Sequence, residues 1–143
     1  MQTTRSTRTV KEKEITRNWH LVDLKGQILG RGITQVAKLL QGKDKRNYVP
    51  NLDAGDYVVV INAAGVKVTG KKPLQKIYDS YSGYPGGRRV VTYKDLMARD
   101  PEKVVRLGIS GMLPKNKHRD PRLARLFIFK DDKHTYSDKF QTK

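Results

Sequence analysis

The chain has 143 residues, a length typical of one domain with a substantial core. Its 30 Lys and Arg residues against 14 Asp and Glu residues give a formal net charge of +16, which indicates a polyanionic partner, nucleic acid before an anionic membrane. The lack of cysteine excludes disulfides and Cys-ligated zinc, and no apolar run approaches the ~20 residues of a membrane-spanning helix.

The first predicted elements are an arm, a strand and a helix. Residues 1–14 contain few apolar side chains and no secretory apolar stretch, so we expect an extended basic arm. Residues 19–23 favour a strand that is followed by a turn at Lys25-Gly26. The next apolar residues recur at helical spacing and predict a helix that ends at Gly42: Ile33, Val36, Ala37 and Leu40.

A second strand is predicted at residues 57–61. This segment is mostly β-branched, which is typical of a strand buried on both faces of a parallel sheet. Residues 62–76 show no decisive periodicity, and residues 77–81 favour a third strand.

The second half of the chain predicts three helices and a last strand. Thr92 is a candidate cap for a short helix. Asp100-Pro101 marks a helix start, because a carboxylate caps the first turn and proline fits the first helical position. Pro114 ends this helix, Asp120-Pro121 starts another, and residues 127–129 form the last strand.

This order of elements implies crossover connections and a mostly parallel sheet that is covered on both sides. No linker divides the chain. We therefore expect one α/β domain over residues 15–130, with an N-terminal arm at residues 1–14 and a C-terminal tail at residues 131–143.

The stretch from Gly83 to Arg89 has the composition of an RNA-binding loop. Its glycines let the backbone approach another chain closely, Tyr84 can stack on an unpaired base, and Arg88 can pair with phosphate. It lies in the most basic block, residues 63–94, which holds seven cationic side chains and one acid. Phosphate binding accounts for this uneven charge better than solubility alone.

The segment from Gly65 to Lys72 follows a strand and nearly matches a nucleotide-binding P-loop. That motif needs Ser or Thr after the lysine to ligate magnesium, and Lys72 stands there instead. A basic loop that contacts RNA phosphates is the better interpretation, with a nucleotide-dependent enzyme as the alternative.

The sequence gives little support for a catalytic site or a metal site. The histidines His20, His118 and His134 lack metal-ligand spacing. Asp53 and Asp56 are candidates for an acid–base pair, although turn and cap chemistry is the commoner role of such a cluster. We predict no cofactor and no enzymatic activity.

A second basic cluster follows the helix that Pro114 ends. If residues 121–126 are helical, Arg122 and Arg125 lie on one face. We prefer RNA contact to a merely solvated face, because one acid, Asp120, accompanies six groups that are or can become cationic: Lys115, Lys117, His118, Arg119, Arg122 and Arg125.

Together, ordered motifs over roughly residues 15–130 make the chain similar to the family of bacterial large-subunit ribosomal protein number thirteen. The matching pieces are Trp19 with Val22-Asp23, Gly30-Arg31, Gly42-Lys43, Tyr48-Val49-Pro50, Asp53 to Tyr57, Asn62-Ala63, Val68 to Lys72, Gly83 to Gly87 and Gly111 to Lys115. The chain departs from the family at His118 to Pro121, where a Leu-Gly-Arg triplet is frequent.

The resemblance implies a three-layer α/β/α fold with a small, mainly parallel four-stranded sheet. It implies a structural constituent of the large subunit that binds 23S-type rRNA, supports early assembly, contacts neighbouring large-subunit proteins and acts as a monomer in cytoplasmic ribosomes. A free RNA-binding regulator that represses a messenger RNA stays as an alternative.

The predicted RNA contacts are cations and two tyrosines. Tyr81 and Tyr84 either stack on bases or belong to the core. The cations are Lys67, Lys71, Lys72, Arg88, Arg89, Lys115, Lys117, Arg119 and Arg122, followed by Lys43, Lys45 and Arg46.

Overall fold

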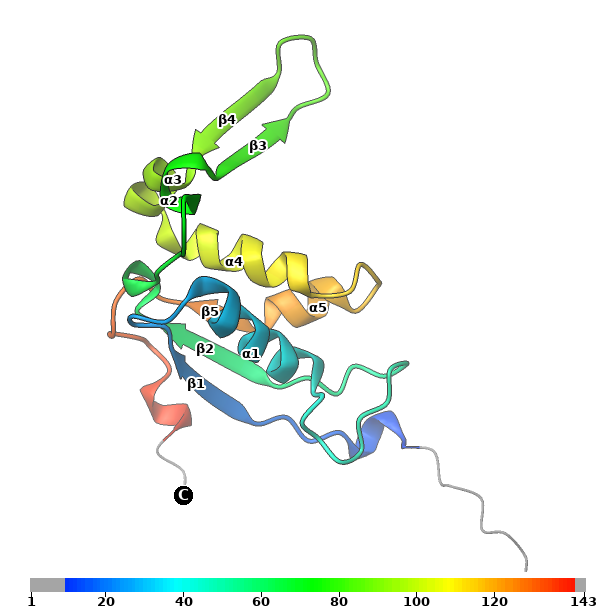
Figure 1. The fold of residues 1–143 in the computed structure, drawn as a ribbon. Helices are drawn as coiled ribbons and strands as arrows, with labels where there is room; N and C mark the ends of the chain where they lie inside the picture. Colours follow the sequence, from blue (N-terminus) through cyan, green and yellow to red (C-terminus); the bar gives the residue numbers. More distant parts are fainter. Residues whose placement is uncertain (1–9, 141–143) are drawn as a thin grey trace, which may run out of the picture.

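The main sheet is three-stranded and wholly parallel. The computed structural model describes residues 10–140, so residues 1–9 of the predicted arm and 141–143 of the predicted tail lie outside the described residues. Strand β2 (Tyr57–Ile61) lies between β1 (Trp19–Asp23) and β5 (Leu126–Ile128) (Figure 1). Four of the five residues of β2 are buried, which confirms the strand predicted from its β-branched run.

A separate antiparallel hairpin projects from this domain. Strand β3 (Ile77–Tyr81) pairs with β4 (Arg88–Thr92), and neither strand pairs with the main sheet (Figure 1). The prediction of one four-stranded sheet is therefore wrong, although residues 77–81 do form a strand. Gly83 and Gly86 have φ values of 88° and 70°, and this left-handed backbone turns the chain back on itself.

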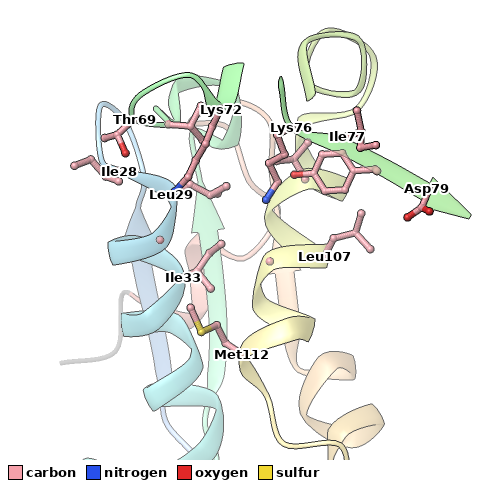
Figure 2. Close-up of a pocket in the computed structure, with 15 residues that line it drawn as sticks. Ile28, Leu29, Ile33, Thr69, Lys72, Lys76, Ile77, Asp79, Leu107 and Met112 are labelled. Carbon is pink, nitrogen blue, oxygen red and sulfur yellow. The ribbon is translucent and has the colours of Figure 1, made fainter. Parts of the chain in front are cut away.

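Two helices cover one face of the main sheet. Helix α1 (Leu29–Gln41) lies beside α4 (Pro101–Met112), and both bury their apolar faces (Figure 2). They approach closely at Gly108, because a Cβ there would lie 2.2 Å from Cδ1 of Ile33. The close packing explains a glycine inside a helix, where it costs about 1 kcal/mol relative to alanine.

The helix boundaries follow the capping signals of the sequence. Gly42 ends α1 in the left-handed conformation with φ 74°, and its backbone N–H donates to the carbonyl oxygens of Lys38 and Leu39. Asp100 caps α4 by accepting a hydrogen bond from the Lys103 amide, and Thr92 caps α3 (Tyr93–Arg99) by accepting one from the Asp95 amide.

Two further helices are short. Helix α2 (Lys72–Gln75) has four residues, and α5 (Arg119–Ala124) has six. Helix α5 begins one residue before the predicted Asp120, which lies in its first turn without capping it. Three 3-10 turns complete the described elements: Glu12–Glu14 (η1), Ala63–Gly65 (η2) and Ser137–Lys139 (η3).

The opposite face of the sheet is covered by the C-terminal segment rather than by an α-helix. Trp19 stacks on Tyr57 with ring centroids 4.5 Å apart, and Tyr136 packs against Trp19 at 5.3 Å and Phe127 at 4.5 Å. The α/β class is confirmed, and its third layer is this strap of residues 129–140. The aromatic side chains of the predicted tail supply the apolar surface that holds it there.

Candidate nucleic-acid interface

The hairpin presents the two predicted tyrosines to solvent. Tyr81 is 67% exposed and Tyr84 is 74% exposed, so neither belongs to the core. Tyr81 lies opposite Arg88 in the β3–β4 register. Arg88 also lies 3.3 Å from Asp79, but both side chains are mostly exposed, and such pairs contribute little to stability. Rings and guanidinium groups are thus free to meet a ligand.

The loop before the hairpin holds three exposed lysines at defined positions. The backbone of Lys67 is tied to α1, because its N–H donates to Gln27 O at 2.9 Å and its carbonyl accepts from Leu29 N at 2.8 Å. Lys71 precedes α2 and Lys72 begins it, and both are exposed. The four-residue α2 lacks the length of a P-loop helix.

A cavity of about 510 Å³ opens between α1, α4 and the base of the hairpin. Ile33, Leu107 and Met112 contribute apolar walls (Figure 2). Lys72 and Lys76 line the cavity, and their side chains extend toward the space between α1 and α4 (Figure 2). Both residues are exposed, and Nζ of Lys76 lies 5.3 Å from the centre of the Tyr78 ring. Sequence reasoning missed Lys76, although it lies in the same basic block.

The second basic cluster divides into exposed and buried parts. Lys115 and Lys117 are exposed in the loop between α4 and α5. Arg119 is half-buried and donates a hydrogen bond to the Ser110 hydroxyl. Arg122 has a side chain only 3% exposed, and its Nε lies 3.2 Å from Asp53 Oδ1. That burial argues against Arg122 as an RNA contact.

Asp53 anchors α5 to the start of β2. Besides Arg122, it pairs with Arg125, whose Nη1 lies 2.7 Å from Oδ2. Burial raises the pKa of the Asp53 carboxyl, but the hydrogen bonds and charges of Arg125 and Arg122 outweigh it, and the pKa ends below its usual value. The carboxylate is therefore ionised and serves structure.

Asp56 forms a second anchor. It pairs with Lys45 and with His20, whose Nε2 lies 2.8 Å from Oδ2, and the Asn18 amide donates to it at 3.0 Å. Burial raises the pKa of Asp56, and Lys45, Asn18 and His20 together bring it below the usual value. Lys45 also donates to the carbonyl oxygens of Thr16 and Ala54.

Asp53 and Asp56 thus serve as ion-pair anchors. The two roles considered from the sequence, an acid–base pair and turn or cap chemistry, did not include this one. Lys45 is committed to this network, whereas its neighbours Lys43 and Arg46 are exposed. Within residues 10–140, no group of three His, Asp or Glu side chains is arranged to hold a metal ion.

Two groups of the exposed candidates lie toward opposite ends of α4. The hairpin joins the start of α4 through α3, whereas Lys115 and Lys117 follow its end (Figure 1). With 12 residues at ~1.5 Å each, α4 is roughly 18 Å long. Cations spread over this length fit an extended polyanion better than a small ligand.

Comparison with known proteins identifies the relatives of the chain. The family model described as Ribosomal protein L13 matches residues 17–135. The large ribosomal subunit protein uL13 of Dictyoglomus thermophilum is 46% identical over 126 residues, which cover 88% of this chain and 89% of that protein. The proteins of the same name from Thermotoga maritima and Clostridioides difficile are each 43% identical over 127 residues, or 89% of this chain, and these cover 85% and 89% of their lengths.

In the part of the chain that the structure describes, no helix is long and apolar enough to cross a lipid bilayer.

Proposed function

Because the chain belongs to the ribosomal protein L13 family, we propose that it is a structural constituent of the large ribosomal subunit, where it binds rRNA and supports early assembly. The match over residues 17–135 carries this conclusion. The named relatives are bacterial, and we therefore place the protein in the cytoplasmic ribosome, in contact with neighbouring large-subunit proteins.

The exposed cations provide the physical basis of binding. Lysine and arginine side chains neutralise phosphates and release counterions, a contribution that does not depend on sequence and weakens with salt. Those that remain accessible are Lys67, Lys71, Lys72, Arg88, Arg89, Lys115, Lys117, Lys43 and Arg46, with Arg119 half-buried. Tyr81 and Tyr84 supply stacking surfaces on the projecting hairpin.

The chain acts in this role as a binding protein and not as an enzyme. The loop from Gly65 to Lys72 lacks the hydroxyl that a P-loop offers to magnesium, and Pro73 stands in its short helix. The paired states of Asp53 and Asp56 argue against general acid–base work. No observation favours a messenger RNA as the partner.

Sedimentation tests the proposal. In cell lysate, the full chain should travel with the large subunit and remain with it through a moderate-salt wash. Crosslinking followed by mapping of the attached RNA should recover large-subunit rRNA. A chain that stays in the soluble fraction, or that recovers only messenger RNA, refutes the proposal.

A further inference from the structure

A second cavity of about 510 Å³ lies away from the hairpin. Its walls come from three separate parts of the chain: the N-terminal segment, the loop before β2, and the start of α5 with the residues that precede it. Arg17, Lys117 and Arg125 contribute cationic groups to these walls, and His118 lies beside them. Lys117, His118 and Arg125 all come from the second basic cluster, for which the sequence predicts RNA contact.

The side chains that line the cavity carry a net positive charge, even when the ion pairs of Asp53 are taken into account. Glu12 and Asp53 are its acids. Asp53 is already shared between Arg125 and Arg122, so that two guanidinium groups face one carboxylate. Arg17 donates to the backbone carbonyl of Asp53 at 3.2 Å, which leaves its charge unneutralised. Within residues 10–140, Lys117 forms no ion pair, and Glu12 alone cannot balance these cations.

The walls also carry surface that suits a sugar or a base. Tyr57, Leu52 and Pro121 line the same cavity as the cations. The volume falls in the range of pockets that hold small molecules, about 300–1,000 Å³, and is large for a bare phosphate. A ligand that combines an anionic group with a planar, partly apolar body fits both features.

We infer that this cavity holds one nucleotide of the bound RNA, with its phosphate against Arg17 and Lys117 and its ribose or base against the wall that includes Tyr57. The inference rests on the proposed function. A guanidinium fork is matched to phosphate oxygens, and splayed-out nucleotides are a usual target of RNA-binding proteins. Lys115, exposed in the same loop as Lys117, continues the cationic surface beyond the cavity.

The cavity is built before any ligand arrives. Arg125 is fixed by its pair with Asp53, and Arg17 is held by the backbone of the same residue. A flexible charged side chain loses conformational entropy when a ligand immobilises it, and this loss weakens binding. A guanidinium that is already held in place loses less entropy. Sequence reasoning missed Arg17 because it stands between the predicted arm and the first predicted strand, where no motif indicates a site.

The test compares two double variants of the full chain. Arg17→Gln with Lys117→Gln removes two cavity charges, and both side chains are exposed, so the fold should be kept. Lys133→Gln with Lys139→Gln removes two exposed charges that do not line the cavity. Binding to transcribed large-subunit rRNA is measured as a function of salt, and thermal midpoints verify folding.

We expect the cavity variant to bind about 10-fold more weakly than the control. The slope of log affinity against log salt should fall by about 1 for each phosphate that the variant no longer neutralises. Chemical probing should also show one nucleotide that the parent chain and the control protect and the cavity variant leaves reactive. Equal affinity, slope and protection in the two variants would overturn the inference while rRNA binding itself stands.

A calorimetric titration with adenosine monophosphate tests whether the cavity binds a nucleotide of RNA or a free nucleotide. We expect no saturable heat at up to ~1 mM, because a single nucleotide lacks the other contacts of RNA. Saturable binding below that concentration, abolished in the cavity variant, would overturn the assignment to RNA in favour of a free nucleotide. A parent chain that fails to bind rRNA would refute the proposed function instead.

Discussion

Replacing Asp53 with asparagine should destabilise the protein more than any comparable change of an exposed acid. The substitution keeps the shape of the side chain and removes its charge. It leaves two guanidinium groups without their shared counter-charge, and those of Arg122 and Arg125 are only 3% and 9% exposed. Removing one partner of a buried ion pair costs about 3–5 kcal/mol.

Because Asp53 is itself 14% exposed, we expect a loss near ~3 kcal/mol, the lower end of that range. That is a large part of the ~5–15 kcal/mol that stabilises a typical domain. The assay is urea unfolding at neutral pH, with the free energy of unfolding extrapolated to water and the m-value checked for a change in the unfolded state.

The matched control is Asp79→Asn. Asp79 pairs with Arg88 on the hairpin, where the two side chains are 59% and 63% exposed, and this change should cost less than about 1 kcal/mol. If Asp53→Asn and Asp79→Asn lower the free energy of unfolding equally, the anchoring role assigned to Asp53 is wrong.

Three further outcomes are expected. The pKa values of Asp53 and Asp56 are lower in the folded state than in the unfolded state, where they are ~4. The stability that these carboxylates contribute is therefore complete above the unfolded pKa and is lost as pH falls through the folded-state pKa. Followed by circular dichroism, the parent chain should lose stability to acid more steeply than Asp53→Asn does. Gly42→Ala should lower the thermal midpoint, because φ is 74° and the new Cβ would lie 2.6 Å from the Ala54 carbonyl oxygen; an unchanged midpoint would contradict this. Tyr84→Ala should leave stability unchanged and weaken rRNA binding by about 1–3 kcal/mol in filter assays, whereas equal binding would exclude base stacking by this ring.

The elements that the sequence predicts well are those with a local cause. The β-branched run of residues 57–61 requires cover on both faces, and the structure places it in the centre of the sheet. Asp100-Pro101 carries its own capping chemistry, and α4 begins there. Such signals depend on neighbours along the chain, and they hold whatever the tertiary fold.

The features that were missed depend on partners far along the chain. The sequence does not indicate strand β4, because the first three of its five residues are exposed and leave little apolar pattern to detect. The sequence predicts an RNA contact at Arg122, and the structure pairs this residue with Asp53, 69 positions away. Charge alone does not reveal whether a guanidinium faces solvent or a buried carboxylate, so the sequence cannot separate surface cations from buried ones.

The pairing of β5 with β2 has a consequence for the order in which the molecule can be completed during synthesis. Strand β2 receives its first neighbour early, but its other edge stays open until Leu126 and the two residues after it have emerged. The aromatic strap that follows cannot close over the sheet before then. A nascent chain that stops short of this point would expose an unpaired apolar edge, so the fold is finished only after residues 126–140 have left the ribosome that makes them.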